Sequence, residues 1–380
     1  MFKRASSRLV RTSSKDSKDS DVSIVNQDAL VKIGRATKTG TLHANEDRCT
    51  VVETLTEVLD EEVFTVSEML EFDLKNSGDL LEKVMYVGVF DGHGGAQCAS
   101  YVARNLHCKI AKNLEAVTCE SLLDPQAPAA VSKSFQEVEE EYTKVANANN
   151  DTSGSCAAVA LICGPDMLLA HAGDCRIVVR DCGTTIVETK DHRADDPVEA
   201  ARITSRGGVI IEGRLNGVLC PSRSFGDTDV KSLDTEEVLI CTPDIGRYSV
   251  DMGAPGKIQS FMILATDGLW DVMDTQEACD FVEKVLKKTG SADVAATKLA
   301  ETASKHNHDD VTVIIVAWQR MKPSKEGSKL IVKTGSRENL SNAGREGSKD
   351  EGEFDPNTLV SPKVMRKNAK PDAKIAGKKN

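Results

Sequence analysis

The chain of 380 residues lacks any apolar segment long enough to cross a membrane. Its longest apolar runs, at 84–90 and 156–164, fall well short of the ~18 residues that a transmembrane helix requires. The first fourteen residues contain no apolar core of signal-peptide length, so we expect neither membrane insertion nor secretion. These residues are rich in Arg and Ser and free of acidic side chains, which leaves a mitochondrial transit peptide as the minor alternative to a cytoplasmic or nuclear protein.

Closely spaced cysteines are also missing. The eleven cysteines are never closer than seven positions apart, so the sequence supports neither a thiolate zinc site nor a Cys-x-x-Cys redox motif. We expect the reduced thiols of an intracellular protein. The chain also has no P-loop, no Gly-x-Ser-x-Gly elbow and no Rossmann glycine pattern, which excludes the commonest nucleotide-binding and acyl-transfer sites.

Acidic residues outnumber basic ones by 59 to 48, which gives a net charge of −11. Residues 1–20 carry +4 and residues 321–380 carry +6, so residues 21–320 must carry −21 to reach that total. A strongly acidic body argues against nucleic-acid binding by that body, because phosphates would be repelled. It suits a cluster of carboxylates that hold divalent cations, although an ordinary solvated surface accounts for most of the charges.

Composition divides the chain into a folded body and two basic tails. We predict a flexible N-terminal segment over 1–25, a single domain over 26–320 and a disordered tail over 321–380 that is rich in Gly, Ser and Lys. Gly-Ser-basic triplets in this tail are candidate kinase sites, and a soluble low-complexity tail explains them equally well. Residues 51–83 are acidic and weakly patterned, which predicts an insertion on the surface.

Hydrophobic patterning of the body predicts a mixture of strands and helices. Buried strands are expected where short β-branched runs end at Gly or Asp, at 84–90, 155–163, 167–171, 176–180, 261–266 and 311–318. Apolar residues at helical spacing predict helices at 96–116, 197–206, 275–288 and 292–305. The order has no strict βαβ alternation, so we expect an α+β fold with largely antiparallel sheets.

Carboxylates recur at the ends of these predicted strands. Asp91, Asp174 and Asp267 directly follow buried runs, and the pairs Asp309-Asp310 and Glu46-Asp47 precede others. Any one of them could be a simple turn residue. Several at equivalent positions can meet at one rim of a sheet, where hard cations take oxygen ligands. Four carboxylates, from Glu46, Asp91, Asp267 and Asp309, would balance two divalent ions, and two such ions can clamp a phosphoryl group.

His93 is the histidine placed beside this predicted rim, two residues after Asp91. An imidazole near a carboxylate–metal cluster can serve as the general acid for a leaving alkoxide. The alternative is a turn histidine with no chemical role.

Seven ordered motifs now carry a family resemblance. They are NEDR (45–48), VGVFDGHGG (87–95), SGSCAAVALI (153–162), HAGDCRIVV (171–179), PSRSFGD (221–227), ILATDGLWDVM (263–273) and DDVTVIIV (309–316). Together they resemble the metal-dependent Ser/Thr protein phosphatases of type 2C, over about residues 31–318. The resemblance implies a four-layer α-β-β-α sandwich, in which helices flank two antiparallel sheets and a dinuclear metal site lies at one edge.

The resemblance also implies roles for individual residues. Asp91 would bridge two Mg²⁺ or Mn²⁺ ions, with Glu46 and the Gly92 carbonyl on one ion and Asp267 and Asp309 on the other. Asp47 would orient a bridging water that attacks phosphorus in line, and His93 would be the general acid. A weaker third metal site would involve Asp174, Asp267 and Asp271.

Two positions depart from the family pattern. The arginine that usually lies four residues before the metal-binding Glu, and pairs with the substrate phosphate, is Leu42 here. We therefore expect weak phosphosubstrate affinity unless a nearby cation compensates, with Arg35, Lys38, His43 and Arg48 as the candidates. The usual Asp-Asn pair before the last strand is Asp309-Asp310, and the extra charge would either tighten metal binding or raise the pKa of a neighbour.

These observations favour an active protein serine/threonine phosphatase that acts on phosphoprotein substrates. The main alternative is a weak or inactive pseudophosphatase that serves as a scaffold, as Leu42 would suggest. A hydrolase of small phosphoesters is a third reading. We expect a monomer with no nucleic-acid or membrane partner for the body.

Overall fold

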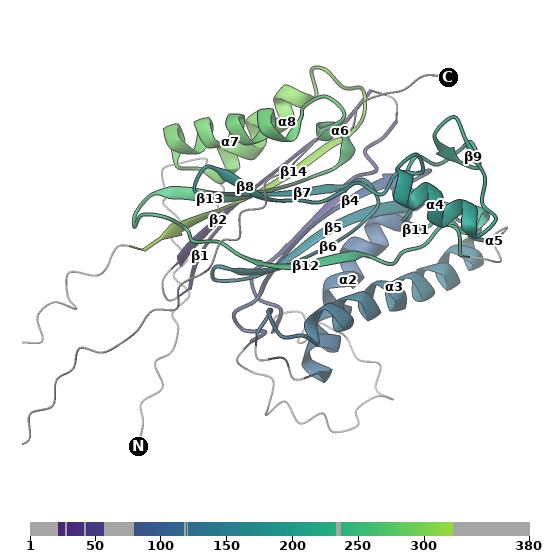
Figure 1. Cartoon of the computed structure of the whole chain (residues 1–380), viewed down its shortest axis with the longest axis horizontal. Coiled ribbons are helices and arrows are strands. Elements are labelled where there is room, and N and C mark those ends of the chain that lie inside the picture. The colour runs from purple at the N-terminus through teal and green to yellow at the C-terminus, as the bar shows by residue number, and fades with distance from the viewer. Residues whose placement is uncertain are drawn as a thin grey trace, which may run out of the picture. The chain divides into compact units, whose positions relative to one another are not determined.

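Two antiparallel β-sheets stack face to face at the centre of the fold (Figure 1). The computed structural model describes residues 22–26, 29–41, 43–56, 80–117, 119, 121–232 and 237–321. The first sheet has the order β1 (Val22–Asn26), β2 (Ala29–Lys38), β14 (Val311–Arg320), β13 (Ile258–Ala265), β7 (Arg176–Asp181) and β8 (Thr184–Glu188). The second has the order β12 (Asp244–Ser249), β6 (Asp166–Ala172), β5 (Gly154–Cys163), β4 (Met85–His93) and β3 (Arg48–Val52), with β11 (Phe225–Gly226) added beside β5.

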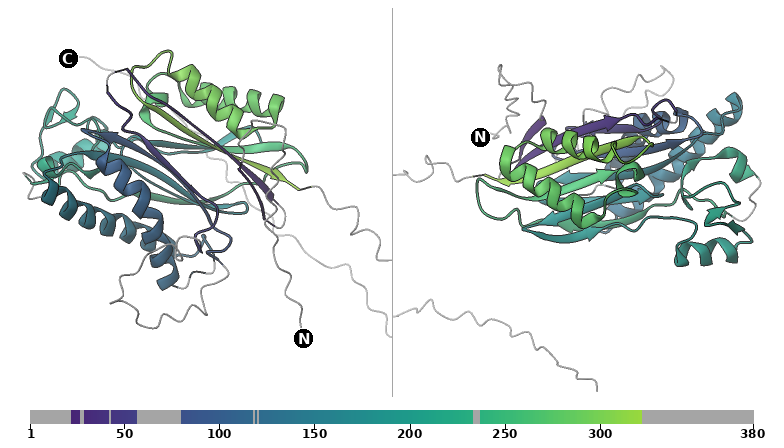
Figure 2. Two further views of the ribbon diagram at one scale, coloured as in Figure 1. Left: turned by 180° about the vertical axis from the view of Figure 1, so that it is seen from behind. Right: turned by 90° about the horizontal axis from the view of Figure 1, so that it is seen from above.

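Helices cover the outer faces of both sheets, as Figures 1 and 2 show. The first sheet is covered by α7 (Thr275–Thr289) and α8 (Ala292–Ala303), with the short α6 (Asp267–Trp270) beside them. The second is covered by α2 (Gln97–Ala116) and α3 (Ala127–Asn149). The helices α4 (Pro197–Ser205) and α5 (Thr228–Ser232) and the hairpin of β9 (Ile210–Ile211) and β10 (Arg214–Leu215) lie at one end. The expected four-layer α-β-β-α sandwich is confirmed.

Alternating side chains on each strand explain the layers. On β4, Val87 and Val89 point into the core between the sheets, while Tyr86 and Phe90 point to the helical side. A strand in the middle layers is therefore apolar on both faces, because successive side chains point to opposite faces. This is why 84–90 and 311–318 read as continuous apolar runs instead of alternating ones.

Some predicted boundaries are wrong. The first sheet already begins at Val22, so 1–25 is not wholly outside the fold, since β1 pairs with β2. The expected insertion is shorter than 51–83, because residues 51 and 52 belong to β3 and because Leu55, Leu80 and Leu81 are buried in the core beside α2. The predictions for 57–79 and for the tails 1–21 and 322–380 lie outside the described residues.

Two further findings concern the composition. All eleven cysteines are free. Within the described part of the chain, no helix combines the length and the apolar character needed to span a bilayer.

Candidate active site between the two sheets

An acidic site lies where strands of both sheets end at the same edge of the sandwich. Asp91 is on β4 of the second sheet, and Asp267 begins α6, two residues after the end of β13 in the first sheet. The backbone N–H of Asp267 approaches Asp91 Oδ2 at 3.4 Å, although the two residues are 176 positions apart. Antiparallel pairing of β13 with β14 places the start of β14, and so Asp309 and Asp310, beside Asp267. The predicted convergence of strand-end carboxylates therefore occurs.

The loop with Glu46 and Asp47 is held against these strand ends. A Cβ atom at Gly92 would lie 2.5 Å from the Glu46 carbonyl oxygen, so only glycine permits this approach. Asp47 is buried, and its Oδ2 accepts a hydrogen bond from Thr266 Oγ1 at 3.0 Å. The predicted residues Glu46, Asp47 and Gly92 thus lie in one place with Asp91.

Asp174 and Asp271 add two further carboxylates near Asp267. Asp174 is buried in the turn between β6 and β7, and Asp271 is exposed at the end of α6. Arg193 Nη1 lies 3.6 Å from Asp174 Oδ2 and 3.8 Å from Asp271 Oδ1. The Cys156 thiol also donates to Asp174 Oδ1 at 3.2 Å. Sequence reasoning missed both Arg193 and Cys156, because neither stands in a recognisable ligand pattern.

Crowded carboxylates shift the acid–base behaviour of the site. Burial raises the pKa of Asp91 well above its usual range, and the charges of Asp267 and Asp47 raise it further. Burial and the neighbouring Asp174 likewise raise the pKa of Asp267. Burial raises the pKa of Asp47 to about 7 against the hydrogen bond from Thr266. Like charges crowded in this way favour the protonated form, and a bound cation would favour the ionised form.

This arrangement fits divalent metal ions. Carboxylate and carbonyl oxygens are the ligands of Mg²⁺ and Mn²⁺, and Mg²⁺ retains several waters, so only a few direct protein ligands are required. The pKa elevation of Asp91 and Asp267 has the sign that cation binding would reverse. About half of the Asp309 side chain is exposed, so the site is open to solvent on that side. Among the site residues named above, only Arg193 carries a positive charge, which leaves most of the negative charge for cations to balance.

His93 ends β4 beside the acidic site. Its Nε2 lies 2.8 Å from Asp227 Oδ1 and 3.0 Å from Oδ2. Burial lowers the pKa of His93, but the hydrogen bond and the charge of Asp227 outweigh this effect, so the pKa is raised overall. Asp227 was absent from the sequence-based site, because its partner lies 134 residues away.

Leu42 lies outside the described residues, but several candidate replacement cations can be placed. Arg48 is already bound to the carbonyls of Asn45 and Asp47 and to Ser100. Lys38 pairs with Glu301 at 3.4 Å. His43 lies 4.0 Å from Asp309 and 3.8 Å from Asp310. Of these three, only His43 is close to the acidic site.

A second group of possible ligands lies apart from these carboxylates. His171, His192 and Asp244 each offer one ligand atom, and these atoms lie within 4.8 Å of one another. By distance alone they could hold a metal ion. However, Arg223 donates to Asp244 at 2.8 Å, and His192 Nδ1 accepts the Gly173 N–H, which leaves the proton on Nε2. His171 Nε2 in turn hydrogen-bonds the Lys190 carbonyl at 3.0 Å, so these groups form a hydrogen-bonded cluster.

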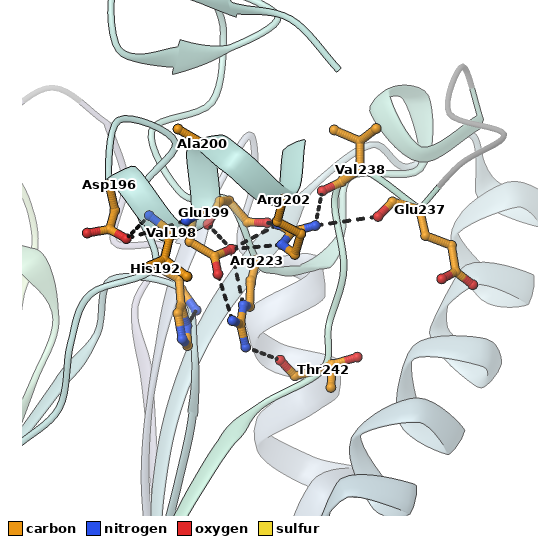
Figure 3. Close-up of polar contacts among 12 residues, drawn as sticks. His192, Asp196, Val198, Glu199, Ala200, Arg202, Arg223, Glu237, Val238 and Thr242 are labelled. Atoms are coloured by element: carbon orange, nitrogen blue, oxygen red, sulfur yellow. Dashed lines mark hydrogen bonds and ion pairs between the residues drawn. The ribbon is translucent and has the colours of Figure 1, made fainter. Parts of the chain in front are cut away.

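Ion pairs around the buried Glu199 hold Arg223 in place next to α4 (Figure 3). Glu199 on α4 is 3% exposed and accepts hydrogen bonds from Arg202, Arg223 and Ser222. Its buried position would raise the pKa, but these three donors lower it to about 2. Arg202 also binds the Val238 carbonyl at 2.7 Å, and Arg223 binds the Thr242 carbonyl at 3.1 Å. Three chain segments, namely α4, residues 222–223 and residues 238–242, are thus joined around one carboxylate.

Comparisons with known proteins agree with this geometry. The family model for protein phosphatase 2C matches residues 61–312. The probable protein phosphatase 2C 59 of Oryza sativa subsp. japonica is 32% identical over 251 residues, which are 65% of this chain and 70% of the relative. The probable protein phosphatase 2C 13 of Arabidopsis thaliana is 33% identical over 253 residues, which are 63% of each chain.

Solved structures share the fold. The serine-threonine phosphatase 2C from Toxoplasma gondii superposes with a TM-score of 0.58 at 22% identity, over 79% of this chain and 99% of the other. A sex-determining protein from C. elegans gives the same TM-score and identity, over 75% of this chain and 64% of the other. With the family match over most of the body and acidic residues gathered at the sheet edge, the chain belongs to the protein phosphatase 2C family of metal-dependent serine/threonine phosphatases.

Proposed function

We propose that the acidic site uses two Mg²⁺ or Mn²⁺ ions to hydrolyse phosphoserine and phosphothreonine side chains of protein substrates. The observation that carries this proposal is the meeting of the half-buried Asp91 and Asp267, from different sheets, at one edge of the sandwich. Asp91 would hold both ions, Glu46 and the Gly92 carbonyl would hold one, and Asp267 and Asp309 would hold the other. When bound, such a metal pair supplies charge neutralisation for the phosphate and acidifies water.

The remaining site residues orient the reactants. Asp47, fixed by Thr266, accepts a hydrogen bond from the attacking water and so directs its lone pair at phosphorus. His93 donates a proton to the leaving alkoxide of the serine or threonine as the P–O bond breaks. No covalent phosphoenzyme is required, because the water attacks directly. Asp174 and Asp271 would hold a weaker third cation together with Asp267.

Arg193 takes part of the role that the family gives to the arginine replaced by Leu42. Its guanidinium is held by Asp174 and Asp271 at the side of the acidic site and is one-third exposed. A guanidinium in this position can hydrogen-bond a phosphate oxygen. His43, near Asp309 and Asp310, supplies a weaker second contact when protonated.

The test is metal-dependent dephosphorylation of a phosphothreonine peptide by the full chain. We expect activity that requires Mn²⁺ or Mg²⁺ and that falls at least about 100-fold in Asp91→Asn and Asp267→Asn. The exposed substitution Asp251→Asn is the matched control and should retain full activity. A folded wild-type chain that binds Mn²⁺ and hydrolyses no phosphopeptide would overturn the proposal and support the scaffold alternative.

That scaffold alternative is not favoured by the family comparisons. A decayed enzyme would be expected to lose its ligands, whereas Glu46, Asp91, Asp267 and Asp309 are all retained. The reading as a hydrolase of small phosphoesters is separated by comparing kcat/KM for a phosphopeptide with that for a small phosphate ester. We expect the peptide to be preferred.

A further inference from the structure

His93 and Asp227 are joined by a short hydrogen-bonded contact between the imidazole and the carboxylate. Both oxygens of the Asp227 carboxylate lie within hydrogen-bond distance of His93 Nε2, at 2.8 and 3.0 Å. Asp227 is 3% exposed and the imidazole is partly open. An ionised carboxylate can only accept, so the contact requires a proton on Nε2 and leaves Nδ1 as the other nitrogen.

Asp227 is itself held in place through both its side chain and its backbone. Ser224 Oγ donates to Asp227 Oδ2 at 2.5 Å, and the Asp227 N–H donates to the Ser153 carbonyl at 3.1 Å. The Asp227 backbone has a φ of 52°, a left-handed conformation that costs energy in a residue other than glycine. A nearby anchor is Glu139 of α3, which accepts the Gly226 N–H at 2.9 Å.

The fold also makes room for this pair. His93 is paired in register with Gly154 on the neighbouring strand β5. A Cβ atom at position 154 would lie 2.2 Å from His93 Nε2 and 2.3 Å from Asp227 Oδ2. The glycine therefore leaves the space in which the imidazole and the carboxylate meet. Strain at Asp227, the absence of a side chain at Gly154 and the Ser224 hydrogen bond all converge on one contact.

We propose that Asp227 is a positioning residue that fixes the ring orientation and tautomer of His93, so that Nδ1 faces the leaving group of the substrate. This inference rests on the proposed function, in which His93 is the general acid. As the P–O bond breaks, the Nδ1 proton passes to the leaving oxygen, and the imidazole keeps the proton on Nε2 that Asp227 holds. The logic is that of a carboxylate that orients a catalytic histidine.

The alternative is a purely structural clamp between β4 and the segment after β11. The two roles differ in their dependence on the leaving group. A serine or threonine alkoxide needs a proton to leave, whereas p-nitrophenolate leaves readily without one. A positioning role therefore affects phosphothreonine hydrolysis selectively, while a structural role affects both substrates alike.

The experiment compares Asp227→Asn, Asp227→Ala and His93→Ala in the full chain at saturating Mn²⁺. For all three we expect kcat on a phosphothreonine peptide to fall about 30- to 100-fold, with KM unchanged and p-nitrophenyl phosphate hydrolysis within about threefold of wild type. The double variant that combines His93→Ala with Asp227→Ala should have the same kcat on the peptide as His93→Ala alone, because both substitutions disable the same unit. Ser224→Ala, which removes only one hydrogen bond to Asp227, should show a smaller selective loss and covers the case of an unfolded Asp227 variant.

A second readout is independent of metal and activity. Nitrogen NMR of the histidine side chains should show His93 as the Nε2–H tautomer in the wild type and a mixture of tautomers in Asp227→Ala. Equal losses on both substrates, no loss on either, or an unchanged tautomer would overturn the inference. Inactivity of the wild type towards both substrates would instead overturn the proposed function, and this inference with it.

Discussion

Asp310 Oδ2 accepts the backbone N–H of Glu46 at 2.8 Å, across 264 residues of sequence. The other oxygen of the same carboxylate accepts the Gly40 N–H, also at 2.8 Å. The acidic residue that replaces the family's usual asparagine therefore holds the loop of a metal-site carboxylate against the start of β14. It also contributes, after burial, to the raised pKa of Asp47.

We predict that Asp310→Asn weakens metal binding. Asparagine has one carbonyl oxygen for two backbone donors, so its amide group must face an N–H and one hydrogen bond is lost. A charge-assisted hydrogen bond contributes about 1.5–3 kcal/mol, so the Mn²⁺ concentration for half-maximal activity should rise about tenfold. Metal titration of the phosphatase activity measures this, with Asp251→Asn as control. An unchanged or lower metal requirement would contradict the role given to Asp310.

Leu42→Arg should improve substrate binding. The substitution restores the cation that the family uses for the phosphate, and a guanidinium–phosphate hydrogen bond contributes about 1.5–3 kcal/mol. We expect KM for a phosphothreonine peptide to fall about tenfold. Leu42→Met, which changes shape without adding charge, is the control and should leave KM unaltered. If KM is also unaltered in Leu42→Arg, phosphate recognition does not depend on this position.

Arg193→Gln tests the proposed replacement cation. Its loss removes a positive charge that lies 3.6 Å from Asp174 and 3.8 Å from Asp271. Because the side chain is partly exposed, we expect the lower end of the range, a rise in KM of about five- to tenfold. Steady-state kinetics with the phosphothreonine peptide measure KM and kcat. Arg206→Gln, which removes an exposed ion pair with Glu237, serves as the control. A change in kcat with constant KM would argue against phosphate binding by Arg193.

Glu199→Gln should destabilise the fold in a pH-dependent way. The pKa of Glu199 is lowered from 4.5 to about 2, so its ionised form stabilises the native state above pH 4.5, and this contribution disappears as the pH falls towards 2. The variant loses charge-assisted hydrogen bonds to Arg202 and Arg223, at a cost of about 2 kcal/mol.

Urea unfolding at pH 7 and at pH 3 measures both effects. The difference between wild type and Glu199→Gln should be largest at pH 7 and should shrink at pH 3. Glu237→Gln breaks an exposed pair with Arg206 and should cost less than about 0.5 kcal/mol. A difference that is equal at both pH values would show that the charge of Glu199 contributes little.

Sequence patterns reveal the buried strands and most of the site, for identifiable reasons. Strands such as β4 and β14 are apolar on both faces and therefore stand out. The edge strands β8 and β12 escape prediction because most of their side chains are exposed. The helix α3 was missed although its signal was present, since Val131, Phe135, Val138 and Tyr142 lie at helical spacing and are buried.

The residues of the acidic site also fall into those that the sequence reveals and those that it does not. Asp91, Asp267 and Asp309 stand at strand ends, a position that can be read locally. The function of Asp227, Arg193 and Asp310 depends on partners 134, 19 and 264 residues away, and no local pattern identifies such partners. Only the packed structure shows that the extra charge of Asp310 faces two backbone donors.

The central place of β14 in the first sheet governs the order of folding. This strand lies between β2 and β13, so one edge of each of these strands has no partner until residues 311–320 have been synthesised. The second sheet is complete once Ser249 has been added, whereas the central strands β13 and β14 of the sheet that covers its inner apolar face, with Val87 and Val89, are still missing. Synthesis at ~5–20 residues per second leaves that face exposed for several seconds. We therefore expect the nascent chain to be most prone to aggregate in this interval, before the last strand completes the first sheet.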